Sequence, residues 1–200
     1  MGETRVALSR QLITEPSLTH LSSLNTEGKE KLRDPQSSQN IAVLLDNIRS
    51  AWNVGAILRS ADGFGFAHAY LCGITPTPDN EAVTKTSLGA EDSVSWSYHK
   101  NAVKLIKGLK AEGWKVFALE EDARATEISH TSPSRDFASA AYPSQHEVLI
   151  VGNEVTGVDP ELLDLCNRIF YIPMRGEKKS FNVAIAFGIA AYALNYQLLK

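Results

Sequence analysis

Short apolar runs alternate with helical patterns along this chain from residue 41 onward. The first run, IAVLLDNI at 41–48, has the length and the continuous apolar character of a strand that is buried on both faces. Similar runs follow at 68–73, 94–99, 115–120, 147–154 and 168–173, and helical patterns occur at 53–63, 102–113, 160–166 and 182–199. Strands that alternate with helices predict an α/β fold, in which a mostly parallel sheet has helices on both faces.

The residues before this series predict a separate segment. Residues 1–40 are polar and irregular, and their five basic side chains balance five acidic ones. We interpret them as an N-terminal extension and residues 41–200 as one domain, because 200 residues suit a single domain with a sizeable core. Residues 74–80 and 121–145 are expected to be loops, the second with at most one short helix.

The net charge and the two cysteines indicate which classes of protein this sequence does not favour. A net charge of −3 lacks the basic excess of a general phosphate binder, so any RNA binding depends on a local patch or on a partner. Cys72 and Cys166 lie far apart and form no disulfide framework, which favours a reducing compartment. The N-terminus lacks the apolar core of a secretory signal, so a cytoplasmic location is expected. The five histidines show no metal-ligand spacing, and no metal site is expected.

The longest apolar run, at 183–194, has 12 residues and is too short to span a bilayer. We expect it to form a buried helix. A polar insert at 175–182 separates it from the preceding strand, and that insert is one of three polar, glycine-bearing loops that follow strands.

Ligands of parallel α/β sheets bind at the carboxyl ends of the strands, which is where these three loops lie. Their sequences are DNIRSAWNVGAILRSADGFG (46–65), VGNEVTGVDPE (151–161) and IPMRGEKKSFN (172–182). No G-x-G-x-x-G follows the first strand, and no G-x-x-x-x-G-K-[ST] is present. A generic dinucleotide-binding or P-loop enzyme therefore lacks its main sequence support.

Together, the three loops resemble motifs 1, 2 and 3 of the SPOUT superfamily, in its SpoU/TrmH branch of RNA ribose 2′-O-methyltransferases. The resemblance covers about residues 41–199 and keeps the order of the motifs. It implies a deep trefoil knot at the C-terminus, S-adenosylmethionine bound in the knot loops, and a homodimer. Physical reasoning alone would not predict a knot, since knotted chains are rare.

The resemblance assigns catalytic roles to five residues, namely Arg59, Asn53, Glu154, Ser180 and Asn182. Each also has a plainer interpretation. Arg59 is also consistent with a solvent-facing helix position, Asn53 with a helix N-cap, and Glu154 with a surface turn. Ser180 or Asn182 could cap the last helix. Free guanidinium is a poor base, so Arg59 is a candidate either for activating the ribose hydroxyl or for holding the ribose or its phosphate.

The resemblance also implies a cofactor pocket and an RNA surface. The expected cofactor residues are Leu119, Gly152, Asn153, Gly157, Ile172, Met174, Ser180 and Asn182; the glycines are equally typical of turns and the apolar residues of an ordinary core. The expected RNA-binding residues are Arg49, Arg175, Lys178 and Lys179, which are also typical of a solvated surface. Phe181 departs from the family pattern, where leucine is usual, and is expected to reshape a pocket or dimer wall.

The leading hypothesis is thus an S-adenosylmethionine-dependent RNA ribose 2′-O-methyltransferase. A compact structured RNA is expected as substrate, tRNA ahead of rRNA, because no separate RNA-binding domain is evident. The alternative is a catalytically silent knotted RNA-binding or assembly protein. The presence of the complete polar set argues against that alternative.

Overall fold

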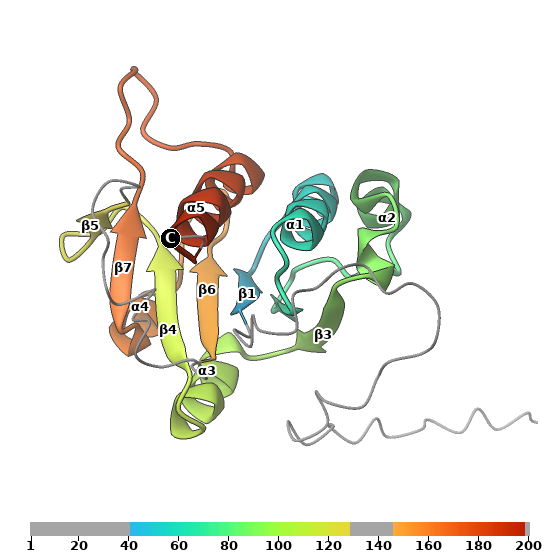
Figure 1. The fold of residues 1–200 in the computed structure, drawn as a ribbon, viewed down its shortest axis with the longest axis horizontal. Coiled ribbons are helices and arrows are strands. Elements are labelled where there is room, and N and C mark those ends of the chain that lie inside the picture. The colour runs from blue at the N-terminus through green and yellow to red at the C-terminus, as the bar shows by residue number, and fades with distance from the viewer. Residues whose placement is uncertain (1–40, 129–145, 199–200) are drawn as a thin grey trace, which may run out of the picture. The chain divides into compact units, whose positions relative to one another are not determined.

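The structure, a computed structural model, describes residues 41–128 and 146–198, with side chains to Ala193. Its centre is one parallel sheet of seven strands in the order β3-β2-β1-β6-β4-β7-β5 (Figure 1). The strands are β1 (Ile41–Asp46), β2 (His68–Cys72), β3 (Ser95–His99), β4 (Lys115–Leu119), β5 (Thr126–Glu127), β6 (Glu147–Val151) and β7 (Arg168–Tyr171). The helices are α1 (Ala51–Gly63), α2 (Glu81–Ser87), α3 (Ala102–Ala111), α4 (Pro160–Leu165) and α5 (Val183–Leu198), with a 3₁₀ turn at Ala90–Asp92.

β1 lies inside the sheet, which explains its continuous apolar run. It pairs with β2 on one side and with β6 on the other, and all six of its residues are buried. Successive residues of a strand point to opposite faces, so a strand covered on both sides has no position where a polar side chain reaches water. The predicted α/β sheet with covered faces is confirmed.

The two faces of the sheet are covered by different helices. Val54, Ile57 and Leu58 of α1 and Phe187 of α5 share one core cluster with every second residue of β1. The intervening residues of β1, such as Leu44, are also fully buried. α3 and α4 pack against each other and bury five leucine and isoleucine side chains, Leu105, Ile106, Leu109, Leu162 and Leu163, which lie outside that cluster. We therefore place α3 and α4 on the second face.

Two elements, the helix α2 and the strand β5, were not predicted from the sequence. α2 has no regular apolar pattern, and its position depends on Gly55 of α1, where a Cβ would lie 2.0 Å from the Oγ1 atom of Thr86. The two-residue strand β5 lies in the part of 121–145 that was predicted as a loop, and that prediction is wrong there. Its pairing with β7 is a long-range contact that a local pattern does not encode. Residues 129–145 and the predicted extension 1–40 lie outside the described residues.

The prediction of a buried last helix is correct for only one side of α5. Phe187, Ala190 and Ala191 are buried, but Ile185 is 55% exposed and Tyr192 is 57% exposed. A helix that is apolar all round and lies on a surface leaves an apolar stripe, and the other described residues do not cover this one. Within the described residues, no helix is both long and apolar enough to cross a membrane.

The strands β4, β6 and β7 run side by side toward the same edge of the sheet, and the long loop before α5 leaves the sheet there (Figure 1). Because all strands are parallel, the loops after β1 and β6 emerge at this carboxyl edge as well. The three polar sequence stretches are thereby brought to one edge.

Candidate functional site

The carboxylate of Glu154 joins the loop after β6 to the start of α1. Its Oε2 atom accepts a hydrogen bond from the backbone N–H of Arg49 at 2.8 Å. Its Oε1 atom accepts from the backbone N–H of Ser50 at 3.0 Å and from Nδ2 of Asn53 at 2.9 Å. Burial by itself raises the pKa of Glu154, but these hydrogen bonds outweigh it and hold the pKa below its ordinary value. Glu154 is therefore an anion at neutral pH, fixed by three donors.

Asn53 connects this carboxylate to the third loop. Its Oδ1 atom accepts a hydrogen bond from Nδ2 of Asn182 at 3.0 Å. Asn182 in turn caps α5, because its Oδ1 atom accepts from the backbone N–H of Ala184 at 2.9 Å and of Ile185 at 3.4 Å. Glu154, Asn53 and Asn182 thus form one hydrogen-bonded chain across all three sequence motifs.

The hydrogen bonds show which residues cap α1 and α5, the two helices for which Asn53, Ser180 and Asn182 were candidate caps. Asn53 is not the N-cap of α1; Ser50 is, and its side chain accepts from the backbone N–H of Asn53. The polar side chain of Asn53 is therefore available for Glu154 and Asn182. At the last helix, the cap is Asn182, whereas Ser180 lies in the wall of a neighbouring cavity.

Asn153 and Gly157 shape the tight turn that presents Glu154. Their backbones exchange two hydrogen bonds of 3.0 and 2.9 Å, and the side chain of Asn153 donates to the carbonyl oxygen of Asn47 at 2.7 Å. Gly157 has a φ of +73°, a left-handed conformation that favours glycine. Gly152 is required for a different reason, since a Cβ there would lie 2.2 Å from the nitrogen of Val158. Both glycines shape the turn itself.

A cavity of about 290 Å³ opens beside this turn. Its walls come from the ends of β4, β6 and β7 and from the start of α5. Of the eight residues predicted to bind the cofactor, seven line it: Leu119, Gly152, Asn153, Gly157, Ile172, Met174 and Ser180. The eighth, Asn182, does not. Phe181, the departure from the family pattern, also lines the cavity and is 40% exposed.

The predicted RNA-binding residues do not behave alike. Arg49, Arg175 and Lys178 are exposed. Lys179 is exposed too, but it differs from the other three because it also lines the cavity. Lys179 is therefore the only one of the four that borders the space where the cofactor is expected.

Arg59 is not brought to Glu154 within one chain. It is exposed on α1, and at 3.6 residues per turn it lies about 120° around the helix axis from Asn53. It shares a side of the helix with Trp52, seven residues earlier, which is 58% exposed. A role for Arg59 at this site needs either a bound molecule that spans the gap or a second copy of the chain.

Sequence reasoning missed Glu120, the residue directly after β4. Its Oε2 atom accepts a hydrogen bond from the backbone N–H of Val158 at 2.8 Å, and it lines the same cavity. The signal was available, because a polar residue at the carboxyl end of a buried strand is a candidate for ligand binding in such folds.

A larger cavity of about 570 Å³ lies elsewhere, between Asp46, Gly73 and the first turns of α3 and α4. None of the predicted catalytic or cofactor residues lines it. The smaller cavity is therefore the better candidate for the active site, since the hydrogen-bonded chain of Glu154 lies next to it.

Comparison with known proteins agrees with this geometry. The model of the SpoU rRNA Methylase family matches residues 40–192. The chain is 30% identical to the tRNA (guanosine(18)-2′-O)-methyltransferase of Thermus thermophilus, over 80% of this chain and 77% of that protein. It is 32% identical to the 23S rRNA (guanosine(2553)-2′-O)-methyltransferase RlmP of Bacillus subtilis, over 76% of this chain and 56% of that protein.

Solved structures give the same result. A crystal structure of an rRNA methyltransferase from Sinorhizobium meliloti with bound AdoMet superimposes with a TM-score of 0.70 and 28% identity, over 80% of this chain and 57% of that one. The TrmH/SpoU tRNA-modifying enzyme of A. aeolicus gives a TM-score of 0.66 and 27% identity, over 79% of this chain and 75% of that one. The chain spans less than two thirds of the Sinorhizobium and Bacillus proteins. It belongs to the SpoU rRNA Methylase family.

Proposed function

We propose that this protein transfers a methyl group from S-adenosylmethionine to a ribose 2′-hydroxyl of a structured RNA. The observation that carries the proposal is the hydrogen-bonded chain of Glu154, Asn53 and Asn182, which unites three distant motifs beside one cavity. Membership of the family confirms the predicted class of activity, RNA ribose 2′-O-methylation, and the predicted cofactor.

The residues around the cavity suit this cofactor. Leu119, Val151 and Ile172 offer apolar surface for a purine, and Glu154 supplies a carboxylate that attracts a cationic ligand. When bound, S-adenosylmethionine supplies an electrophilic methyl carbon on a sulfonium. No covalent nucleophile is needed from the protein, whose task is to orient the hydroxyl and help its proton leave.

In this proposal, the polar residues divide that task. Glu154 and Asn182 hold the side chain of Asn53, and the three together shape the entrance where a ribose would lie. Arg59 binds the ribose or its phosphate, because a guanidinium group is a strong donor but a poor base at neutral pH. Lys178, Arg175 and Arg49 are exposed cations that are suited to RNA phosphates.

We propose that the active unit is a homodimer. The helices α1 and α5 pack against each other (Figure 1). Both carry exposed apolar side chains, which are Trp52 on α1 and Ile185, Ile189 and Tyr192 on α5. A stripe of this kind is typical of a surface that another protein covers. Arg59 lies on the same side of α1 as Trp52, so a second copy on this stripe could bring its own Arg59 to the site of the first.

We further propose that the C-terminal segment forms the deep trefoil knot that the family resemblance implies. β7 lies between β4 and β5, yet α5 returns to pack against α1 and β4. The loop 172–182 therefore crosses strand ends next to the turn of Glu154. A crystal structure that traces the whole chain, including residues 129–145, will test the threading.

We propose tRNA as the first substrate to examine and rRNA as the second, with the protein acting in the cytoplasm. The Thermus relative is named for a tRNA and the Bacillus relative for an rRNA, and both are named for a guanosine. The test is a map of 2′-O-methylated riboses in total RNA from cells with and without the gene. We expect one site, or a small number of sites, to lose methylation when the gene is removed. If no site changes while the purified protein still binds both S-adenosylmethionine and RNA, the silent RNA-binding alternative is correct.

A further inference from the structure

Glu120 connects the end of β4 to the turn that forms one wall of the smaller cavity. It is half-buried, and its Oε2 atom accepts a hydrogen bond from the backbone N–H of Val158 at 2.8 Å. Its Oε1 atom accepts from the backbone N–H of Glu121 at 3.0 Å. One carboxylate therefore ties two segments that are 38 residues apart.

The same carboxylate also fills the space beside Gly157. A Cβ on Gly157 would lie 2.4 Å from the Oε2 atom of Glu120 and 3.0 Å from its carboxyl carbon. Gly157 closes the Asn153–Gly157 turn in its left-handed conformation. The position of the turn thus depends on the close fit of Glu120 against a residue that has no side chain.

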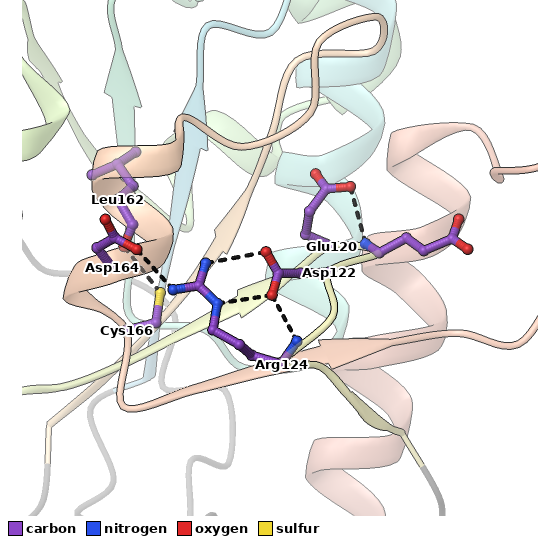
Figure 2. A network of polar contacts seen from close by, with 7 residues as sticks. Glu120, Asp122, Arg124, Leu162, Asp164 and Cys166 are labelled. Atoms are coloured by element: carbon purple, nitrogen blue, oxygen red, sulfur yellow. Dashed lines mark hydrogen bonds and ion pairs between the residues drawn. The ribbon is translucent and has the colours of Figure 1, made fainter.

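The residues after Glu120 extend this contact to α4 (Figure 2). Arg124 donates two hydrogen bonds to Oδ1 of Asp122, both of 2.8 Å, and one from Nη1 to Oδ1 of Asp164 at 2.7 Å. Asp164 belongs to α4, which begins two residues after Val158. The Arg124–Asp164 pair is exposed at 52% and 71%, so its contribution to stability is small. The hydrogen bond between Glu120 and Val158 is half-buried and lies at the cavity, whereas neither Arg124 nor Asp164 lines the cavity.

We propose that Glu120 is a positioning residue, which holds the Gly157–Val158 segment in place as the wall of the cofactor cavity and thereby sets the affinity for S-adenosylmethionine. This inference rests on the proposed function, because it takes the smaller cavity as the cofactor site. Glu154, which lies in the same turn, is held independently by the start of α1. Loss of Glu120 is therefore expected to affect the cofactor more than the transfer step.

The decisive experiment separates the reach of the side chain from its charge. Glu120→Gln keeps an oxygen that can accept from Val158 but removes the charge, whereas Glu120→Asp keeps the charge but is one methylene shorter. We expect Glu120→Asp and Glu120→Ala to raise the Kd and the KM for S-adenosylmethionine about tenfold, with kcat and the KM for RNA changed less than about threefold. Glu120→Gln is expected to stay within about threefold of the unchanged protein.

A second set of variants keeps the inference testable if Glu120→Ala does not fold. Gly157→Ala pushes against the carboxylate and is expected to weaken cofactor binding as much as Glu120→Asp does. In the double variant with Glu120→Ala, the two losses should be less than additive, because the side chain that the new methyl group meets is gone. Arg124→Ala is the matched control, and it should leave the Kd within about twofold.

The results that would overturn the inference differ from those that would overturn the proposed function. If isothermal titration finds no binding of S-adenosylmethionine to the unchanged protein, the proposed function fails. If the unchanged protein binds it but Glu120→Asp does so equally well, Glu120 does not position the wall. A loss with Glu120→Gln and not with Glu120→Asp would mean that the charge of Glu120, and not its reach, is what matters.

Discussion

Glu154 shows how much one carboxylate can organise at the edge of a parallel sheet. Its three donors come from the first residues of α1 and the loop before it, over 100 positions earlier in the chain. A surface turn residue would have water as its partner and would have no reason for a lowered pKa. Asn53 links this carboxylate by a further hydrogen bond to Asn182. A substitution at any of the three residues therefore alters hydrogen bonds in loops that are remote in sequence.

We predict that Glu154→Gln lowers both activity and stability. The amide has one acceptor and one donor, so it cannot accept from Arg49, Ser50 and Asn53 together, and at least one N–H loses its partner. The free energy of unfolding should fall by about 1–3 kcal/mol, measured by urea denaturation. The control is Glu161→Gln, which breaks the exposed pair with Lys107 and should cost less than about 1 kcal/mol. Equal effects of the two substitutions would contradict the account.

We predict that Arg59→Ala abolishes most of the activity and leaves the fold intact. The side chain of Arg59 is exposed and makes no hydrogen bond or ion pair to the other described residues, so the free energy of unfolding should change by less than about 0.5 kcal/mol. Methyl transfer should fall by about 100-fold or more if the guanidinium binds the reacting ribose or phosphate. The affinity for S-adenosylmethionine should stay the same. An active Arg59→Ala protein would show that the arginine is a solvated surface residue.

Individual elements differ in how far their sequence predicts them. β1 and β6 were predictable because both are buried on two faces and consist of nearly unbroken apolar residues. α2 was not, since its place depends on a glycine of α1 that leaves room for it. The family motifs predicted that Glu154, Asn53 and Asn182 belong to one site, and the structure joins these three, whereas Arg59 does not reach them within one chain. The cap of α1 at Ser50 is a local contact that the sequence prediction overlooked, whereas the contact of Glu120 with the turn of Glu154 depends on how loops meet in space.

β6 also carries a buried acid with a testable pH dependence. Glu147 is 6% exposed, and burial raises its pKa to about 8, although Lys115 lowers it in part. Between the ordinary value of 4.5 and about 8, the folded state holds a proton that the unfolded state has released. Stability from this group is therefore present at low pH and is lost as the pH rises through that window.

We predict that Glu147→Gln removes this dependence, because the amide imitates the protonated acid. Relative to the variant, the unchanged protein should lose up to roughly 4 kcal/mol of unfolding free energy between pH 5 and pH 8. Denaturation of both proteins at several pH values isolates the effect, since other titrating groups cancel in the difference. A constant difference across that range would contradict the raised pKa.

At the scale of the whole molecule, the described part of a single chain leaves two features unexplained. The apolar stripe of Trp52, Ile185, Ile189 and Tyr192 is exposed, and Arg59 lies on the wrong side of α1 to reach the Glu154 of its own chain. One proposal, a homodimer built on this stripe, accounts for both. The proposed knot and the proposed dimer were expected from the family resemblance, and periodicity alone predicted neither.

We predict that Ile185→Glu yields a monomer without activity, as measured by light scattering and methyl transfer. A charge on the stripe would have to be buried in the dimer, and an unpaired buried charge is strongly unfavourable. Lys110→Glu, which places the same side chain on α3 away from the stripe, is the control and should stay dimeric. A dimeric Ile185→Glu protein would place the interface elsewhere.

Mixing two inactive variants tests the shared site. If Arg59 acts in the site of the partner, a dimer of one Arg59→Ala chain and one Glu154→Gln chain has one site with both changes and one site with neither. Mixed dimers should therefore recover up to about half of the activity per dimer when the Glu154→Gln chain itself is inactive. No recovery would mean that Arg59 serves its own chain.

The most direct test of the central claim is methyl transfer by the purified protein. Total tRNA and ribosomal RNA are incubated separately with S-adenosylmethionine that carries a labelled methyl group, and the nucleosides are then identified by mass spectrometry. The account predicts a labelled 2′-O-methyl nucleoside, with tRNA the better substrate, and no label with Arg59→Ala. A label on a base, or no label in either RNA from a protein that binds the cofactor, would contradict it.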